Sequence, residues 1–89
     1  MVLLGGTLNE SELRELHKKV NKQCIDIAVQ RGHEYNADGN MIGSYSEYAI
    51  DDIASLIKIK AIRIKNNPDI AKRECPDIIN YAIEILRRL

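Results

Sequence analysis

The chain has 89 residues, 45% of them hydrophobic and 29% charged, which is typical of one globular domain and excludes a disordered segment. Thirteen Lys and Arg residues balance thirteen Asp and Glu residues, so the formal net charge is zero and nucleic acid is not an expected partner. No apolar run approaches the length of a membrane span, so no membrane contact is expected either.

Neither the first seven residues nor the two cysteines indicate a particular kind of site. The opening MVLLGG is too short for a signal peptide, so we expect residues 1–7 to form a flexible terminus or an oligomer contact. Cys24 and Cys75 have neither CxxC spacing nor a histidine cluster nearby. We therefore expect free thiols in a cytoplasmic protein, with a disulfide as the alternative. The whole chain, 1–89, is treated as a single domain.

The first predicted helix begins after Asn9, which can cap it, and Glu12 stands at the position that completes a capping box. Apolar residues then recur at steps of three and four, as on one side of an amphipathic helix. These residues are Leu13, Leu16, Val20, Cys24, Ile27 and Ala28. Gly32 is expected to end the helix, because glycine commonly adopts the left-handed conformation at that place.

The second predicted helix contains the stretch from Leu56 to Lys65, LIKIKAIRIK, whose near alternation of apolar and cationic residues also fits a strand. A strand there would be unusually long, with no turn to divide it. Apolar residues at three- and four-residue steps favour a helix, starting near the alternative caps Ser44 and Ser46. Its apolar stripe comprises Ile50, Ile53, Ile57, Ala61 and Ile64, widened by Leu56, Ile59 and Ile62, so we expect burial on most sides.

The third part of the chain begins at Asn67-Pro68, which ends the second helix or starts the next element. Because Pro76 breaks or kinks a helix outside its first turn, we predict a short helical turn at residues 69–73 and a helix over 75–88. Its apolar surface comprises Ile78, Ile79, Ala82, Ile83, Ile85, Leu86 and Leu89, opposite a polar side of Asp77, Asn80, Tyr81 and Glu84.

The predicted fold is all-α. Three main helices, at about residues 9–31, 46–66 and 75–88, are expected to form an antiparallel bundle. So short a chain, with so few aromatic residues, builds only a modest core of its own. We therefore expect dimerisation or a higher homo-oligomer to complete the bundle.

Charged pairs on the second and third helices form the candidate site. Lys60 and Arg63 are three residues apart and share a helix face, and so do Glu74 and Asp77. Antiparallel packing would bring the two pairs together. Two carboxylates one turn apart suit Mg²⁺, and a Lys/Arg pair suits phosphate. The alternative interpretation is a network of surface salt bridges without further function.

Several short motifs occur in an order that resembles a known family. Arg31-Gly32-His33-Glu34-Tyr35 resembles an RGxxYG element, and Lys60-Ala61-Ile62-Arg63 a KxxR signature. Asn67-Pro68 and Glu74-x-x-Asp77-Ile78-x-x-Tyr81 resemble an NP turn and a closing acidic helix. These elements are found together in small, mostly phage-encoded helical domains of largely unknown function. That family is similar to the MazG-like all-α nucleoside triphosphate pyrophosphatases.

The resemblance implies a Mg²⁺-dependent nucleoside triphosphate pyrophosphohydrolase that is dimeric or larger. It assigns catalysis to Glu74 and Asp77, phosphate binding to Lys60 and Arg63, and base stacking to Tyr35 or Tyr81. The implied metal ligands are Asp51, Asp52, Glu74 and Asp77. The ExxE pair of those enzymes is not reproduced, since the central helix carries only Glu47, Asp51 and Asp52 as acids.

A non-enzymatic alternative explains the same residues. In it the chain is a helical oligomerisation protein of phage or viral type, whose charged residues pair between subunits. The isoleucine-rich helices would then leave apolar faces for a partner.

Overall fold

The computed structural model describes residues 6–35 and 47–89. In these two ranges all regular structure is helical, as predicted, and LIKIKAIRIK is part of a helix. The elements are α1 (Glu10–Tyr35), α2 (Ile50–Asn66), the 3-10 turn η1 (Pro68–Ile70) and α3 (Ala71–Arg87). None of these helices is both long enough and apolar enough to cross a membrane. The expected serine caps and most of residues 1–7 lie outside the described ranges.

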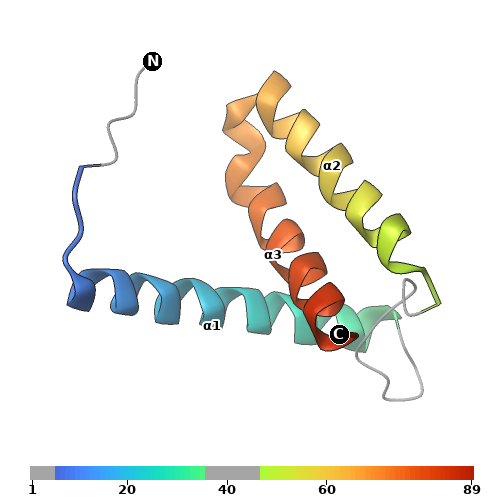
Figure 1. The fold of residues 1–89 in the computed structure, drawn as a ribbon, viewed down its shortest axis with the longest axis horizontal. Coiled ribbons are helices and arrows are strands. Elements are labelled where there is room, and N and C mark those ends of the chain that lie inside the picture. Colours follow the sequence, from blue (N-terminus) through green and yellow to red (C-terminus); the bar gives the residue numbers. More distant parts are fainter. Residues whose placement is uncertain (1–5, 36–46) are drawn as a thin grey trace.

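The predicted antiparallel packing holds for α2 and α3, which run side by side in opposite directions and are joined by η1 (Figure 1). The first helix differs from the prediction. It lies across the hairpin instead of along it, and its contacts are with α3 and not with α2 (Figure 1). Only the second half of α1 meets α3, while its first half extends away from the other helices.

The start of α1 is a reciprocal capping box, as predicted. The Glu12 amide donates to Asn9 Oδ1 at 2.8 Å, and the Asn9 amide donates to Glu12 Oε1 at 3.1 Å. The predicted end was wrong, because the helix continues through a buried Gly32 to Tyr35. A side-chain hydrogen bond from Gln30 to Glu34 spans the glycine at 3.1 Å. This local hydrogen bond offsets part of the free-energy cost of placing a glycine inside a helix.

The start of α2 is later than predicted. Residues 47–49 are not helical, and the helix begins at Ile50. Its cap comes from inside the helix, since the Ala49 amide donates to Asp52 Oδ2 at 3.2 Å. The carboxylates of Asp51 and Asp52 thus lie in the first turn, where the helix dipole favours negative charge.

The third helix is longer than predicted because Pro76 does not interrupt it. The Asn67 side chain caps η1 by accepting from the Asp69 amide at 3.3 Å, and α3 follows directly from Ala71. A proline at position 76 removes the donor to the Lys72 carbonyl. Glu74 and Asp77, on either side of the proline, both pair with cations from other helices. These tertiary contacts stabilise a helix that local rules would end.

Polar side chains occupy places that the sequence assigned to apolar ones. Among the described residues Cys24 and Ile53 are the only apolar side chains that are fully buried, whereas Glu74, Asp77 and Glu84 are buried too. The predicted polar side of α3 therefore packs inward. The expected burial of α2 on most sides was wrong as well, because α1 does not reach it. Large apolar side chains left exposed on the hairpin include Ile59, Ile62, Ile83, Leu86 and Leu89.

Ion pairs around Glu84 lie at the end of the hairpin opposite η1. Glu84 accepts from Arg87 at 2.6 Å and from Arg88 at 2.9 Å, and the hydrogen bond from Arg87 is the main reason that the pKa of Glu84 lies below its ordinary value. Arg88 also donates to the carbonyl of Tyr48, just before α2. The end of α3 is thereby attached to the start of α2.

The sparse core makes a direct prediction about stability. Ile53→Ala should lower the free energy of unfolding by about 2–5 kcal/mol, because Ile53 is fully buried and its truncation leaves a cavity. Ile59→Ala, in the same helix but 48% exposed, is the matched control and should cost much less. Urea unfolding followed by circular dichroism measures both. Equal losses in the two variants would contradict the described core.

Candidate functional site

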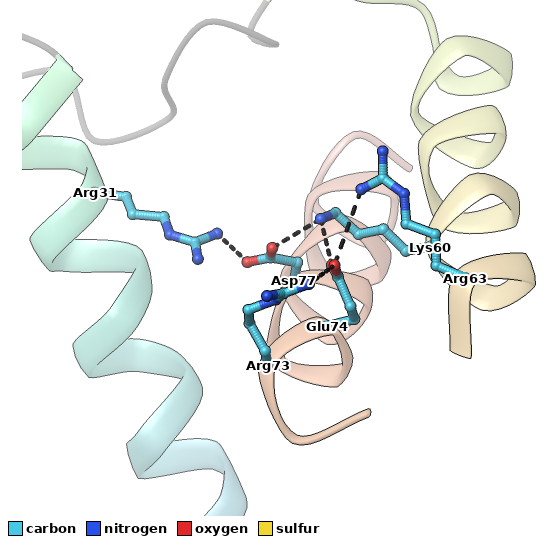
Figure 2. Close-up of polar contacts among 6 residues, drawn as sticks. All are labelled: Arg31, Lys60, Arg63, Arg73, Glu74 and Asp77. Atoms are coloured by element: carbon cyan, nitrogen blue, oxygen red, sulfur yellow. Dashed lines mark hydrogen bonds and ion pairs between the residues drawn. The ribbon is translucent and has the colours of Figure 1, made fainter. Parts of the chain in front are cut away.

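Two buried carboxylates on α3 form the centre of the candidate site. Glu74 is 4% exposed and Asp77 is 7% exposed, and their spacing of three residues places them on one face of the helix. This face lies between α1 and α2 (Figure 2). Burial of charged carboxylates is unfavourable unless cations and hydrogen bonds compensate for the lost water, so their partners determine what the site can do.

Lys60 of α2 bridges the two carboxylates. Its Nζ lies 2.7 Å from Glu74 Oε2 and 3.0 Å from Asp77 Oδ2, and the lysine side chain is 15% exposed (Figure 2). The predicted convergence of the cationic helix on the acidic pair is thus confirmed for this residue. Because Lys60 is largely buried and donates to both carboxylates, Glu74 and Asp77 already neutralise its positive charge.

Three arginines surround this centre, each from a different helix (Figure 2). Arg31 of α1 pairs with Asp77, Arg63 of α2 lies 3.9 Å from Glu74 Oε1, and Arg73 of α3 lies 3.4 Å from the same oxygen. The three side chains are 47%, 57% and 73% exposed, respectively. They therefore touch the carboxylates on one side and solvent on the other.

The charges of this group do not cancel. Four cations, Lys60 and three arginines, face two carboxylates, which leaves a formal excess of two positive charges. The group, called the ion cluster below, comprises Arg31, Lys60, Arg63, Arg73, Glu74 and Asp77. Guanidinium groups that are oriented by one carboxylate and still exposed are suited to a second anion, above all to phosphate oxygens.

The ion pairs shift two pKa values within the cluster. The hydrogen bond from Lys60 lowers the pKa of Glu74, against the opposing effect of burial. For Lys60, burial alone would lower the pKa, but the hydrogen bonds and charges of Glu74 and Asp77 outweigh it and raise the pKa above its ordinary value. The ionised forms of both residues are therefore stabilised near neutral pH.

The predicted set of metal ligands is only partly brought together. Glu74 and Asp77 are neighbours, but Asp51 and Asp52 lie at the start of α2, eight residues or more before Lys60, or about 12 Å along the helix. Among the described residues no group of three His, Cys, Asp or Glu side chains is placed to hold a metal ion. Mg²⁺ often uses one or two protein carboxylates with phosphates and water, so Glu74 and Asp77 fit that smaller requirement if Lys60 moves away.

The structure describes the side chain of only one of the two tyrosines that were predicted to stack on a base. Tyr81 is half-buried on α3, one turn after Asp77. The side chain of Tyr35, at the end of α1, lies outside the described part of the chain. The stacking role of both tyrosines stays a prediction.

Two of the residues in the cluster were not predicted as site residues. The sequence places Arg31 only at the start of the RGxxYG-like element and Arg73 in a separate short turn. A signal for Arg73 was present, since it immediately precedes Glu74. For Arg31 no local signal exists, because its partner Asp77 is 46 residues away.

Comparisons of the chain with protein-family models, with curated proteins and with solved structures found no match.

The two pKa shifts predict how stability depends on pH. The depressed pKa of Glu74 stabilises the fold above its ordinary value of 4.5, and this contribution is lost as the pH falls through the lower pKa of the folded protein. The raised pKa of Lys60 stabilises the fold below its ordinary value of 10.5 and is lost as the pH rises through the higher pKa of the folded protein. Stability should thus be greatest between these limits.

The variant Glu74→Gln tests the acidic side of this dependence. It should be less stable than the wild type at pH 7, and its stability should fall less steeply toward pH 3, with Glu84 supplying the remaining slope. Glu15→Gln is the control, because the Glu15 side chain is 72% exposed. Chemical unfolding at several pH values measures the slopes. Identical slopes in Glu74→Gln and the wild type would contradict the assignment.

Proposed function

We propose that the ion cluster binds the phosphate groups of a nucleoside phosphate, as in a MazG-like domain. The observation that supports this proposal is the cationic excess of the cluster, with three partly exposed guanidinium groups around two buried carboxylates. Guanidinium and phosphate match in geometry as well as in charge.

The proposed reaction is Mg²⁺-dependent nucleoside triphosphate pyrophosphohydrolysis. Glu74 and Asp77 would hold the metal, which supplies charge stabilisation at the phosphate oxygens. Lys60 lies where a bridging cation would bind, within 3.0 Å of both carboxylates, so it must leave them in the active form. Asp51 and Asp52 would join only through a further rearrangement. Tyr81, one turn from Asp77, or Tyr35 would stack on the base.

Asp77→Asn tests this function. The substitution keeps the size of the side chain but removes a charge from the metal and from the Arg31 partner, so pyrophosphate release should fall to background, at least about a hundredfold. A panel of nucleoside triphosphates with Mg²⁺ or Mn²⁺ gives the measurement, and circular dichroism verifies the fold. Glu15→Gln should keep full activity. A wild-type protein that neither binds nor cleaves any nucleotide of the panel would overturn the proposal.

A second candidate function is homo-oligomerisation, and a different observation favours it. The α1 stripe that packs on α3 through Cys24 continues toward the start of the helix, where Leu13 is 47% and Leu16 is 45% exposed. This half of α1 extends away from α2 and α3 (Figure 1). A second copy is the partner we propose, because the chain buries few apolar side chains by itself and its zero net charge gives copies no overall repulsion.

Leu16→Lys tests this candidate. A charge on the exposed stripe should convert the oligomer to a monomer, which sedimentation velocity detects as a lower sedimentation coefficient. Asn21→Lys is the matched control, since it adds the same charge to the same helix at an exposed polar position, and it should remain oligomeric. A wild-type protein that sediments as a monomer at all concentrations would remove this candidate.

A further inference from the structure

A hollow of about 280 Å³ lies beside the ion cluster, between the end of α1 and the start of α3. Arg31 and Glu34 line it from α1, and Lys72, Arg73 and Pro76 line it from α3. This hollow offers space for a ligand on the α1 side of the buried carboxylates.

The hollow is lined by more positive than negative charge. Arg31, Lys72 and Arg73 face only one carboxylate there, that of Glu34, so the formal excess is again two positive charges. Lys72 and Arg73 also belong to the first turn of α3, the end at which the helix dipole is positive. These features together favour an anion of more than one charge.

The three cations that line the hollow differ in how far other residues already orient their side chains. Behind the hollow, Asp77 orients Arg31 and Glu74 orients Arg73, while roughly half or more of each side chain remains exposed. Lys72 is exposed and forms no ion pair with any residue in the ranges 6–35 and 47–89. Lys60, in contrast, is enclosed and shared between two carboxylates. A ligand can therefore use Lys72 without breaking a described contact.

We propose that this hollow binds the polyphosphate chain of the ligand, through Arg31, Lys72 and Arg73. The inference deepens the proposed function, on which the nucleoside part of the ligand rests, and it moves phosphate binding from the Lys60/Arg63 side to the α1 side. At about 280 Å³ the hollow is at the lower end of the roughly 300–1,000 Å³ of pockets that enclose a drug-sized ligand, so it has room for a polyphosphate chain. The sugar and the base would extend out of the hollow.

Titration calorimetry with inorganic tripolyphosphate and with a mixture of nucleoside triphosphates tests the inference in the absence of metal. Lys72→Gln should weaken binding of both ligands roughly tenfold, the effect of removing one charge-assisted hydrogen bond. Arg73→Gln should weaken binding to a similar extent. Lys58→Gln, which removes an exposed lysine of α2, a helix that does not line the hollow, is the matched control and should bind like the wild type.

The outcomes separate the inference from the proposed function. If nucleotides bind and Arg63→Gln weakens binding while Lys72→Gln and Arg73→Gln do not, the inference is overturned and the proposed function stands. If tripolyphosphate binds through Lys72 and Arg73 but no nucleotide is bound or cleaved, the inference stands and the proposed function fails. A wild-type protein that binds neither ligand overturns both.

Discussion

The bond between Lys60 and the two carboxylates of α3 is the interaction on which the described arrangement depends. It joins α2 to α3, and Arg31 extends the same network to α1, so that one cluster connects all three helices. Only two apolar side chains of the described residues are fully buried, which leaves the ion pairs an unusual share in fixing how the helices pack. Removing one partner of such a buried group is more damaging than replacing the entire group by apolar residues, because it leaves a buried charge without compensation.

The pairing of arginines with buried carboxylates relates helix packing to ligand binding. Arg31 and Arg73 each have one carboxylate partner and one exposed side, so under the proposed function a phosphate would compete with Asp77 and Glu74 for these guanidinium groups. Any weakening of those pairs leaves Glu74 and Asp77 with less positive charge around them and thus with greater affinity for another cation. Anion binding at the arginines and cation binding at the carboxylates would therefore favour each other, in line with the reciprocity of coupled equilibria.

Regular periodicity in the sequence was sufficient to predict the helices, and the spacing of Lys60, Glu74 and Asp77 was sufficient to predict that they meet. Errors arose where particular side-chain contacts decide the outcome. Gly32 and Pro76 normally end helices, yet both lie within helices here. A local hydrogen bond between Gln30 and Glu34 spans Gly32, whereas pairs with cations from other helices flank Pro76. The burial of Glu84 was not predicted either, although its partners Arg87 and Arg88 are only three and four residues away. Arg31 could not be found at all from local spacing.

The attachment of Arg88 to Glu84 and to the Tyr48 carbonyl has a consequence for the order in which the protein loses structure. Because these contacts join α2 and α3 at one end of the hairpin and Lys60 joins them near the other, we expect the hairpin to unfold as one cooperative unit. The first helix has only its second half in contact with that unit, chiefly at Cys24, whose carbonyl accepts from Asn80 at 3.1 Å, and at Arg31. Local opening should therefore start with the backbone amides early in α1, while those of the hairpin stay protected from hydrogen exchange until the whole molecule unfolds.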